Sequence, residues 1–108
     1  MKAMRLAQFG SPRNLKLEDA PDPMPAAGEV LVKVEAAGVN PADLVRMAGN
    51  YPLPLPLPYI PGTDVSGTVV SVGKGIGDFV VGDRVFGRST NGGGYAEQAV
   101  LPVKETFL

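Results

Sequence analysis

Hydrophobic and polar residues alternate along much of the chain, which is the pattern of strands that bury one face. The clearest example is the segment 29–39, in which Val30, Val32 and Val34 would face one side and Lys33 and Glu35 the other. Further strands are expected at residues 1–9, 15–18, 65–72 and 95–101. This spacing predicts a protein built from short strands.

One segment, from Asn40 to Ala48, carries helix signals instead. Asn40 is a suitable N-cap and Pro41 occupies the first helical position. Asp43 lies three residues after the cap, where it can act as a capping-box partner. Gly49 can adopt the left-handed conformation that ends a helix. We therefore expect a single short helix here.

The expected helix has an apolar side made of Leu44, Val45 and Met47. Asp43 and Arg46 are three residues apart, a spacing at which opposite charges meet on a helix surface. They are expected to form an exposed ion pair worth a few tenths of a kcal/mol.

Glycine and proline, with 14 and 11 residues among 108, separate the expected strands. Prolines keep the connection 19–28 irregular and make the segment 51–61 extended, without allowing it to be a central strand. Residues 88–94 are expected to form a polar loop, and residues 79–86 two short strands around a tight turn. The glycines of 73–77 open no helix, so they predict a turn rather than a phosphate loop. Short strands, one helix and regular turns together predict a mainly β, barrel-like or rolled sheet.

Composition and charge narrow the possible functions. A net charge of −1 without a basic cluster argues against binding nucleic acid or an anionic membrane. No apolar run is long enough to span a bilayer, and no signal-peptide core is present, so a cytoplasmic protein is expected. With no cysteine and no histidine, the chain cannot form a thiolate or imidazole zinc site, a histidine proton relay or a cysteine nucleophile.

Four separated motifs carry a resemblance to a known family. They are AAGVNPADLVRMAGNYP at 36–52, PYIPGTDVSGTVVSVG at 58–73, GDRVFG at 82–87 and GGYAEQAVLP at 93–102. In this order and spacing the chain resembles the medium-chain dehydrogenase/reductase superfamily over nearly its whole length. The resemblance implies that residues 1–108 are a GroES-like, partly open β-barrel domain of the kind found at the N-terminus of alcohol dehydrogenases.

Within this superfamily, the chain resembles the zinc-free quinone oxidoreductase branch. Zinc alcohol dehydrogenases carry a cysteine where this chain has Asn40, a His-Glu pair where it has Thr63 and Asp64, and a four-cysteine lobe after GDRV. Amide and hydroxyl groups are weak neutral ligands that would not hold zinc without thiolate or imidazole. We therefore expect no metal.

The resemblance implies that hydride passes from NADPH to a quinone or another α,β-unsaturated carbonyl. It assigns the binding of the cofactor to a Rossmann domain, which residues 1–108 are not expected to contain. Residues 1–108 are thus expected to be an incomplete catalytic domain, inactive alone and unable to bind NADPH appreciably. A stand-alone binding or self-assembly module derived from the family is the alternative, because open strand edges favour homo-oligomers.

Three residues are candidates for the site, each with a structural alternative. The amide of Asn40 would hydrogen-bond the nicotinamide ribose or carboxamide by resemblance, while the same residue serves as N-cap. Tyr51 would line the cleft of nicotinamide and substrate and contact the reacting carbonyl, or else cover the barrel mouth. Thr63 would also lie in the cleft, whereas Asp64 is expected to form an ordinary turn with it.

Overall fold

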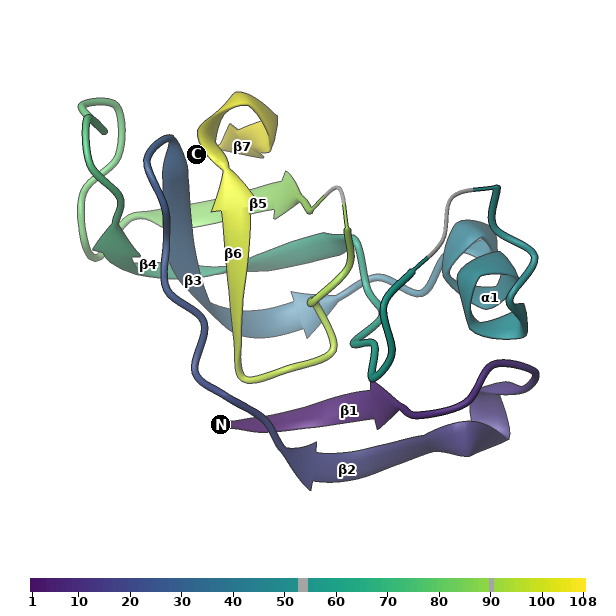
Figure 1. Ribbon diagram of the computed structural model, residues 1–108. Coiled ribbons are helices and arrows are strands. Elements are labelled where there is room, and N and C mark those ends of the chain that lie inside the picture. Colours follow the sequence, from purple (N-terminus) through teal and green to yellow (C-terminus); the bar gives the residue numbers. More distant parts are fainter. Residues whose placement is uncertain (53–54, 90) are drawn as a thin grey trace.

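The computed structural model describes residues 1–52, 55–89 and 91–108, and it contains two antiparallel sheets and one α-helix (Figure 1). A hairpin pairs β1 (Lys2–Leu6) with β2 (Leu15–Asp19). The larger sheet has the strand order β6-β3-β4-β5-β7. Its strands are β3 (Glu29–Ala37), β4 (Asp64–Val72), β5 (Arg84–Arg88), β6 (Gln98–Pro102) and β7 (Thr106–Phe107). This curled sheet with one helix confirms the predicted mainly β, partly open barrel.

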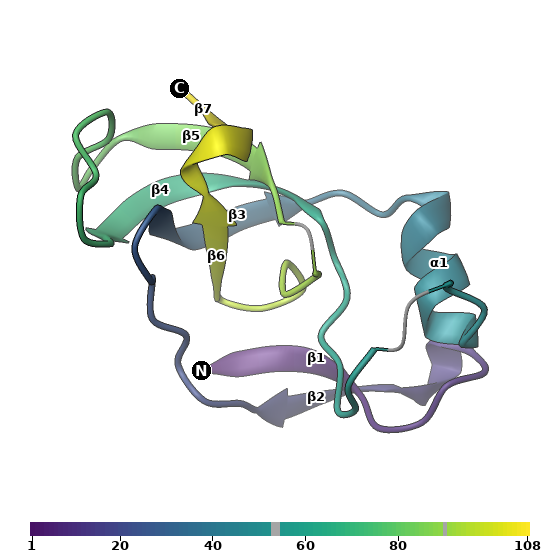
Figure 2. The ribbon, with the colours of Figure 1, turned by 45° about the horizontal axis from the view of Figure 1, so that its top comes forward.

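The hairpin and the large sheet are joined by backbone hydrogen bonds rather than by a continuous ladder. The N–H of Met4 donates to the carbonyl of Tyr95 (2.8 Å), and the N–H of Leu6 donates to the carbonyl of Tyr59 (2.7 Å). The segments around Tyr59 and Tyr95, which are far apart in the sequence, therefore both bind to β1. Figure 2 shows β1 and β2 as a layer separate from the curled sheet, with α1 beyond one end of both.

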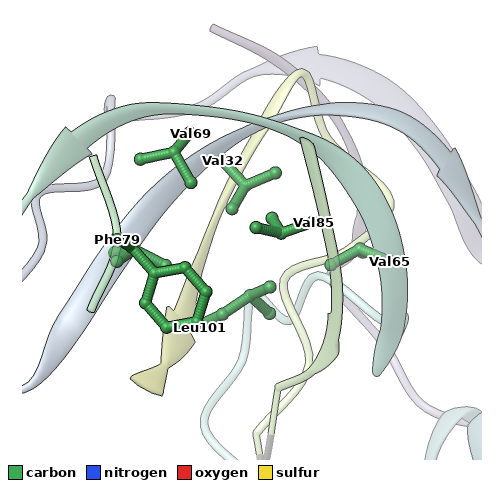
Figure 3. Packing of buried hydrophobic residues seen from close by; sticks show 7 residues of the cluster. Val32, Val65, Val69, Phe79, Val85 and Leu101 are labelled. Atoms are coloured by element: carbon green, nitrogen blue, oxygen red, sulfur yellow. The ribbon is translucent and has the colours of Figure 1, made fainter. Parts of the chain in front are cut away.

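The core lies inside the curl of the large sheet, where side chains from four strands converge (Figure 3). Val30 and Val32 of β3 are fully buried and Lys33 is exposed, as the alternation predicted. The cluster comprises Val30, Val32, Val65, Val69, Phe79, Val85 and Leu101. Each of these side chains removes apolar area from water, which stabilises the fold by about 25 cal/mol per Å².

The prediction of two strands over residues 79–86 is wrong in its first half. Only Arg84–Arg88 forms a strand, and Phe79 reaches the core from a loop. Val80 to Asp83 instead form a tight turn, in which the N–H of Asp83 donates to the carbonyl of Val80 (3.1 Å). The side chain of Asp83 also accepts from the N–H of Val80 (3.0 Å), so this turn is fixed twice.

The other turn predictions are confirmed where the structure describes the chain. Residues 73–77 form a turn and open no helix. In the proline-rich segment, Tyr59 makes one isolated bridge to Leu6, while residues 53 and 54 lie outside the described residues. The predicted polar loop 88–94 contains residue 90, which is likewise outside them. Two 3-10 turns, Pro12–Asn14 and Val103–Glu105, were not predicted.

Helix α1 (Pro41–Ala48) has the predicted ends, but of its predicted apolar side only Met47 is buried (2% exposed). Asn40 is its N-cap, and Gly49 ends it in the left-handed region with φ 84°. Leu44 and Val45 are exposed (46% and 42%). Within the described residues, no helix has the length and apolar character needed to cross a membrane.

The buried residues of α1 are Asp43, Arg46 and Met47. The expected exposed ion pair of Asp43 and Arg46 is therefore wrong, since their side chains are 0% and 6% exposed. The physical reason is that charged side chains can be buried when other polar groups meet them. Those groups come from segments distant in the sequence.

Candidate functional site

Asn40 lies half-buried at the start of α1 and is fixed by two carboxylates. Its side-chain Nδ2 donates to Oδ2 of Asp64 over 2.7 Å. Its backbone N–H donates to Oδ2 of Asp43 over 2.9 Å, as expected for a capping box. The amide of Asn40 is therefore held in one orientation at the end of β3. Asp64, expected in a turn, is the first residue of β4.

On the buried side of α1, Asp43 is the centre of a buried polar cluster. Its Oδ1 lies 4.0 Å from Nη1 of Arg46, and its Oδ2 accepts from the hydroxyl of Tyr95 over 3.3 Å. Tyr95 follows the glycine-rich loop 92–94 and also lies 3.4 Å from the carbonyl of Gly38. The cluster thus joins the helix to the start of the last long strand.

Tyr51 is held against the same cluster by Arg46. Nη2 of Arg46 donates to the Tyr51 oxygen over 3.1 Å, and the guanidinium carbon lies 4.4 Å from the centre of the Tyr51 ring. A cation at this distance from an aromatic face is attracted to it, more strongly when both are removed from water. Tyr51 is half-buried and connects to Asn40 through Arg46 and Asp43.

Several atoms of this cluster are buried and make no hydrogen bond to any described residue. They are Oδ1 of Asp43, Nε and Nη1 of Arg46 and the hydroxyl of Tyr59. Native proteins leave few such groups, and each one costs free energy. Two of these atoms, Oδ1 of Asp43 and Nη1 of Arg46, face each other at 4.0 Å, so charge attraction rather than a hydrogen bond joins them.

Two glycines make room for the tyrosines of the cluster. A Cβ at Gly62 would lie 2.5 Å from the Tyr95 ring, and a Cβ at Gly92 would lie 2.5 Å from the Tyr59 hydroxyl. Both glycines have positive φ, 99° and 87°. Any other residue at either position would displace a tyrosine from the cluster.

Burial changes the acidity of these tyrosines. It raises the pKa of Tyr95 to about 12, and the negative charge of Asp43 acts in the same direction. Burial also raises the pKa of Tyr59, although the positive charge of Arg46 opposes it. Burial lowers the pKa of Arg46, but its hydrogen bond to Tyr51 and the nearby negative charges raise it overall. The phenols are therefore neutral and the guanidinium is charged at neutral pH.

Tyr95 makes the fold sensitive to alkaline pH. The folded chain keeps its proton up to about pH 12, whereas an ordinary tyrosine loses it near 10.0, so the stabilising contribution is complete below pH 10 and is lost as the pH rises to about 12. We expect the urea midpoint of unfolding to fall across this interval. In Tyr95→Phe the fall should be smaller, and an equal fall in both proteins would contradict the assignment.

An open groove of about 660 Å³ is lined in part by Asp64, the partner of the Asn40 amide. Its walls include Gly38 and Asp64 next to the amide, and the exposed aromatic rings of Phe86 and Phe107. These two rings stack with their centres 5.6 Å apart. The groove combines an apolar surface with a few polar groups, as ligand sites do.

Of the predicted site residues, the structure brings two into one network. Asn40 and Tyr51 are joined through Asp43 and Arg46. Thr63 is buried (5% exposed), and its carbonyl accepts from the N–H of Ser89 over 2.7 Å. None of the three predicted site residues is among those that line the groove, and Asn40 meets the groove through its hydrogen bond to Asp64.

The sequence predicted an exposed ion pair of Asp43 and Arg46 and indicated no role for Tyr59 or Tyr95. One signal could have found them. Gly62 and Gly92 lie in loops, where a glycine often marks the close approach of another group, although the tyrosines that they face, Tyr95 and Tyr59, are distant from them in the sequence.

Within the described ranges 1–52, 55–89 and 91–108, no three Asp, Glu, Cys or His residues are grouped so as to hold a metal ion. The zinc-free character of the site stays a prediction based on the residue types at Asn40 and Thr63.

Comparison with known proteins places the chain in a family. The family model described as the alcohol dehydrogenase GroES-like domain matches residues 26–108. The quinone oxidoreductase of Rattus norvegicus is 46% identical over 108 residues, which cover 99% of this chain and 33% of that protein. This chain therefore spans about a third of the length of that relative.

Solved structures of similar proteins point to the same family. A mycobacterial quinone oxidoreductase is 41% identical with a TM-score of 0.89, over 98% of this chain and 32% of that one. The Escherichia coli quinone oxidoreductase complexed with NADPH is 28% identical with a TM-score of 0.92, over 100% of this chain and 33% of that one. By its family match and by these relatives, the chain belongs to the alcohol dehydrogenase GroES-like domain family, within the medium-chain dehydrogenase/reductase superfamily.

Proposed function

We propose that this domain forms one wall of the catalytic cleft of an NADPH-dependent oxidoreductase that reduces a quinone or another α,β-unsaturated carbonyl. The observation that carries the proposal is the side-chain amide of Asn40, held by Asp64, a residue that lines an open, largely apolar groove. The likeness to quinone oxidoreductases, one of them complexed with NADPH, supports the substrate class and the cofactor.

The donor set at Asn40 fits a nicotinamide nucleoside. An asparagine amide has two N–H donors and one oxygen acceptor, and the hydrogen bond to Asp64 uses one donor. The remaining groups match the hydroxyls of a ribose or a carboxamide. When bound, NADPH would supply the hydride. The groove volume of about 660 Å³ lies within the range of small-molecule sites.

The residues of this chain would bind and orient the reactants. Asn40 would fix the nicotinamide nucleoside relative to the groove, and Tyr51 would hydrogen-bond the carbonyl oxygen of the substrate. A donor placed in advance at an oxygen that becomes negative lowers the barrier, because it need not reorganise during the reaction.

The proposal includes a second domain for the rest of the cofactor. Among the residues that the structure describes, no glycine-rich turn opens a helix, so the pyrophosphate of NADPH would be held elsewhere. We expect the chain alone to bind NADPH negligibly in a titration followed by nicotinamide fluorescence. Micromolar affinity of the chain for NADPH would contradict the proposal that a second domain holds the pyrophosphate.

A hybrid enzyme tests the function directly. Residues 1–108 would replace the matched third of the Rattus norvegicus quinone oxidoreductase, and NADPH oxidation would be followed with a quinone. We expect activity in the hybrid, and the KM for NADPH to rise about 3- to 10-fold in Asn40→Ser, since one hydrogen bond is worth about 1 kcal/mol. Serine is an equally good N-cap, so helix stability is matched. An unchanged KM would leave Asn40 with the capping role alone.

One observation favours a self-assembly module as the second candidate. Phe86 and Phe107 are more than half exposed (55% and 53%) and stack on each other at the groove. Exposed aromatic surface of this kind is typical of an interface. Analytical ultracentrifugation separates the candidates: a stable oligomer of defined size favours the module, and a monomer favours the enzyme domain.

A further inference from the structure

The hydrogen bond between Arg46 and Tyr51 has only one possible direction. A guanidinium carries five N–H donors and no acceptor. In the contact of 3.1 Å between Nη2 of Arg46 and the Tyr51 oxygen, the tyrosine must therefore accept. Its own O–H hydrogen is left to point to another partner.

The guanidinium is fixed in place on several sides. Its side chain is 6% exposed, it packs 4.4 Å from the centre of the Tyr51 ring, and the carboxylate of Asp43 lies 4.0 Å from Nη1. Asp43 is in turn held by the N–H of Asn40 and the hydroxyl of Tyr95. Arg46 thus couples the residue proposed to hold the cofactor to the residue proposed to contact the substrate.

Burying an arginine is costly unless its charge is used. Nε and Nη1 of Arg46 make no hydrogen bond to the described residues, so the bond to Tyr51 is the side-chain hydrogen bond that this buried cation makes among them. The carboxylate of Asp43 balances the charge of Arg46, and the hydrogen bond to Tyr51 is a second interaction that this ion pair does not require.

We propose that Arg46 is a positioning residue that turns Tyr51 into a proton donor for the carbonyl oxygen of the substrate. The inference rests on the proposed function and deepens it. When a quinone or enone accepts hydride from the reduced nicotinamide, a carbon–hydrogen bond forms and its oxygen becomes negative. Tyr51 breaks its O–H bond and gives that oxygen the proton.

The resulting phenolate keeps the hydrogen bond from Arg46, and its negative charge is stabilised by the adjacent guanidinium. Water then returns a proton to Tyr51. Hydride and proton together complete the two-electron reduction of the substrate, with NADPH as the reductant. Arg46 itself neither gains nor loses a proton.

The geometry is tested on the chain as it stands, by NMR of the arginine side chains. The Tyr51 ring should shift the Arg46 side-chain signals upfield through its ring current. Tyr51→Phe keeps the ring and should keep the shift, whereas Tyr51→Leu should abolish it. Arg46 signals that are the same in Tyr51→Leu and in the unsubstituted chain would overturn the proposal without bearing on the enzyme activity.

The role is tested in the hybrid enzyme. Tyr51→Phe should lower kcat about 100-fold with little change in KM, the size expected when a general acid is lost. The double variant Asp43→Asn/Arg46→Met leaves no unpaired buried charge and should lower kcat about 10- to 100-fold. Arg46→Lys keeps a cation with N–H donors and should recover part of this loss.

Non-additivity separates positioning from mere stability. In the Tyr51→Phe background, the double variant should lower kcat less than twofold further, because the two changes remove one function. Equal losses in both backgrounds, or a raised KM with unchanged kcat, would overturn the role of Arg46 while leaving the proposed function intact. A hybrid without any activity would overturn both.

Discussion

Replacing Gly67 by alanine should destabilise the fold by about 3 kcal/mol or more, because the central pair of strands cannot accept a methyl group there. Gly67 is buried in β4, opposite Val34 of β3. A Cβ at this position would lie 1.9 Å from the carbonyl oxygen of Lys33 and 2.9 Å from Cγ1 of Val32. The oxygen belongs to the backbone, so no side-chain rotation relieves the collision and the two strands must separate.

The matched control is Gly77→Ala in the turn after β4. A Cβ there has no atom within 4 Å, and Gly77 is not among the glycines with positive φ. Its unfolding free energy should stay within about 0.5 kcal/mol of the parent chain. Urea unfolding followed by circular dichroism measures both variants. Similar losses for the two would show that glycine flexibility, and not the packing of β3 on β4, sets the effect.

The sequence predicted the ends of helix α1 better than its orientation. Caps depend on local chemistry, and Asn40 and Gly49 carry that chemistry within a few residues. Orientation depends on what packs against the helix. Of the apolar side predicted from Leu44, Val45 and Met47, only Met47 is buried, because Arg46 beside it is buried against Tyr51.

Phe79 illustrates why an apolar residue does not always mark a strand. It is 7% exposed and packs with Val69 and Leu101 in the core, yet the chain around it forms a turn (Figure 3). Alternation reports which side chains are buried, and a loop can bury one large ring as well as a strand can. Strand pairing needs partners that are fixed only by the tertiary fold.

The candidate site was predicted in part. Asn40 was identified by residue type and resemblance, and its hydrogen bond to Asp64 adds the reason for its orientation. The polar cluster behind it was not predicted. Tyr95 contacts Asp43 from 52 positions along the chain, and no local pattern in the sequence specifies a contact of that separation.

Removing only the charge of Arg46 should destabilise the fold by about 3 to 5 kcal/mol, since it leaves a buried carboxylate without its cation. In Arg46→Met the carboxylate of Asp43, which is 0% exposed, would keep the hydrogen bonds from Asn40 and Tyr95 but lose the neighbouring positive charge. Urea unfolding at neutral pH measures this loss.

The double variant Asp43→Asn/Arg46→Met decides whether charge or packing causes the loss. An asparagine carbonyl can still accept from the backbone N–H of Asn40, so the start of α1 keeps its cap. Neutralising both partners should recover at least half of the free energy lost in Arg46→Met, because a buried ion pair exchanged for uncharged groups is often close to neutral in stability. A double variant no more stable than Arg46→Met would instead assign the loss to the packing of the guanidinium on Tyr51, which methionine does not reproduce.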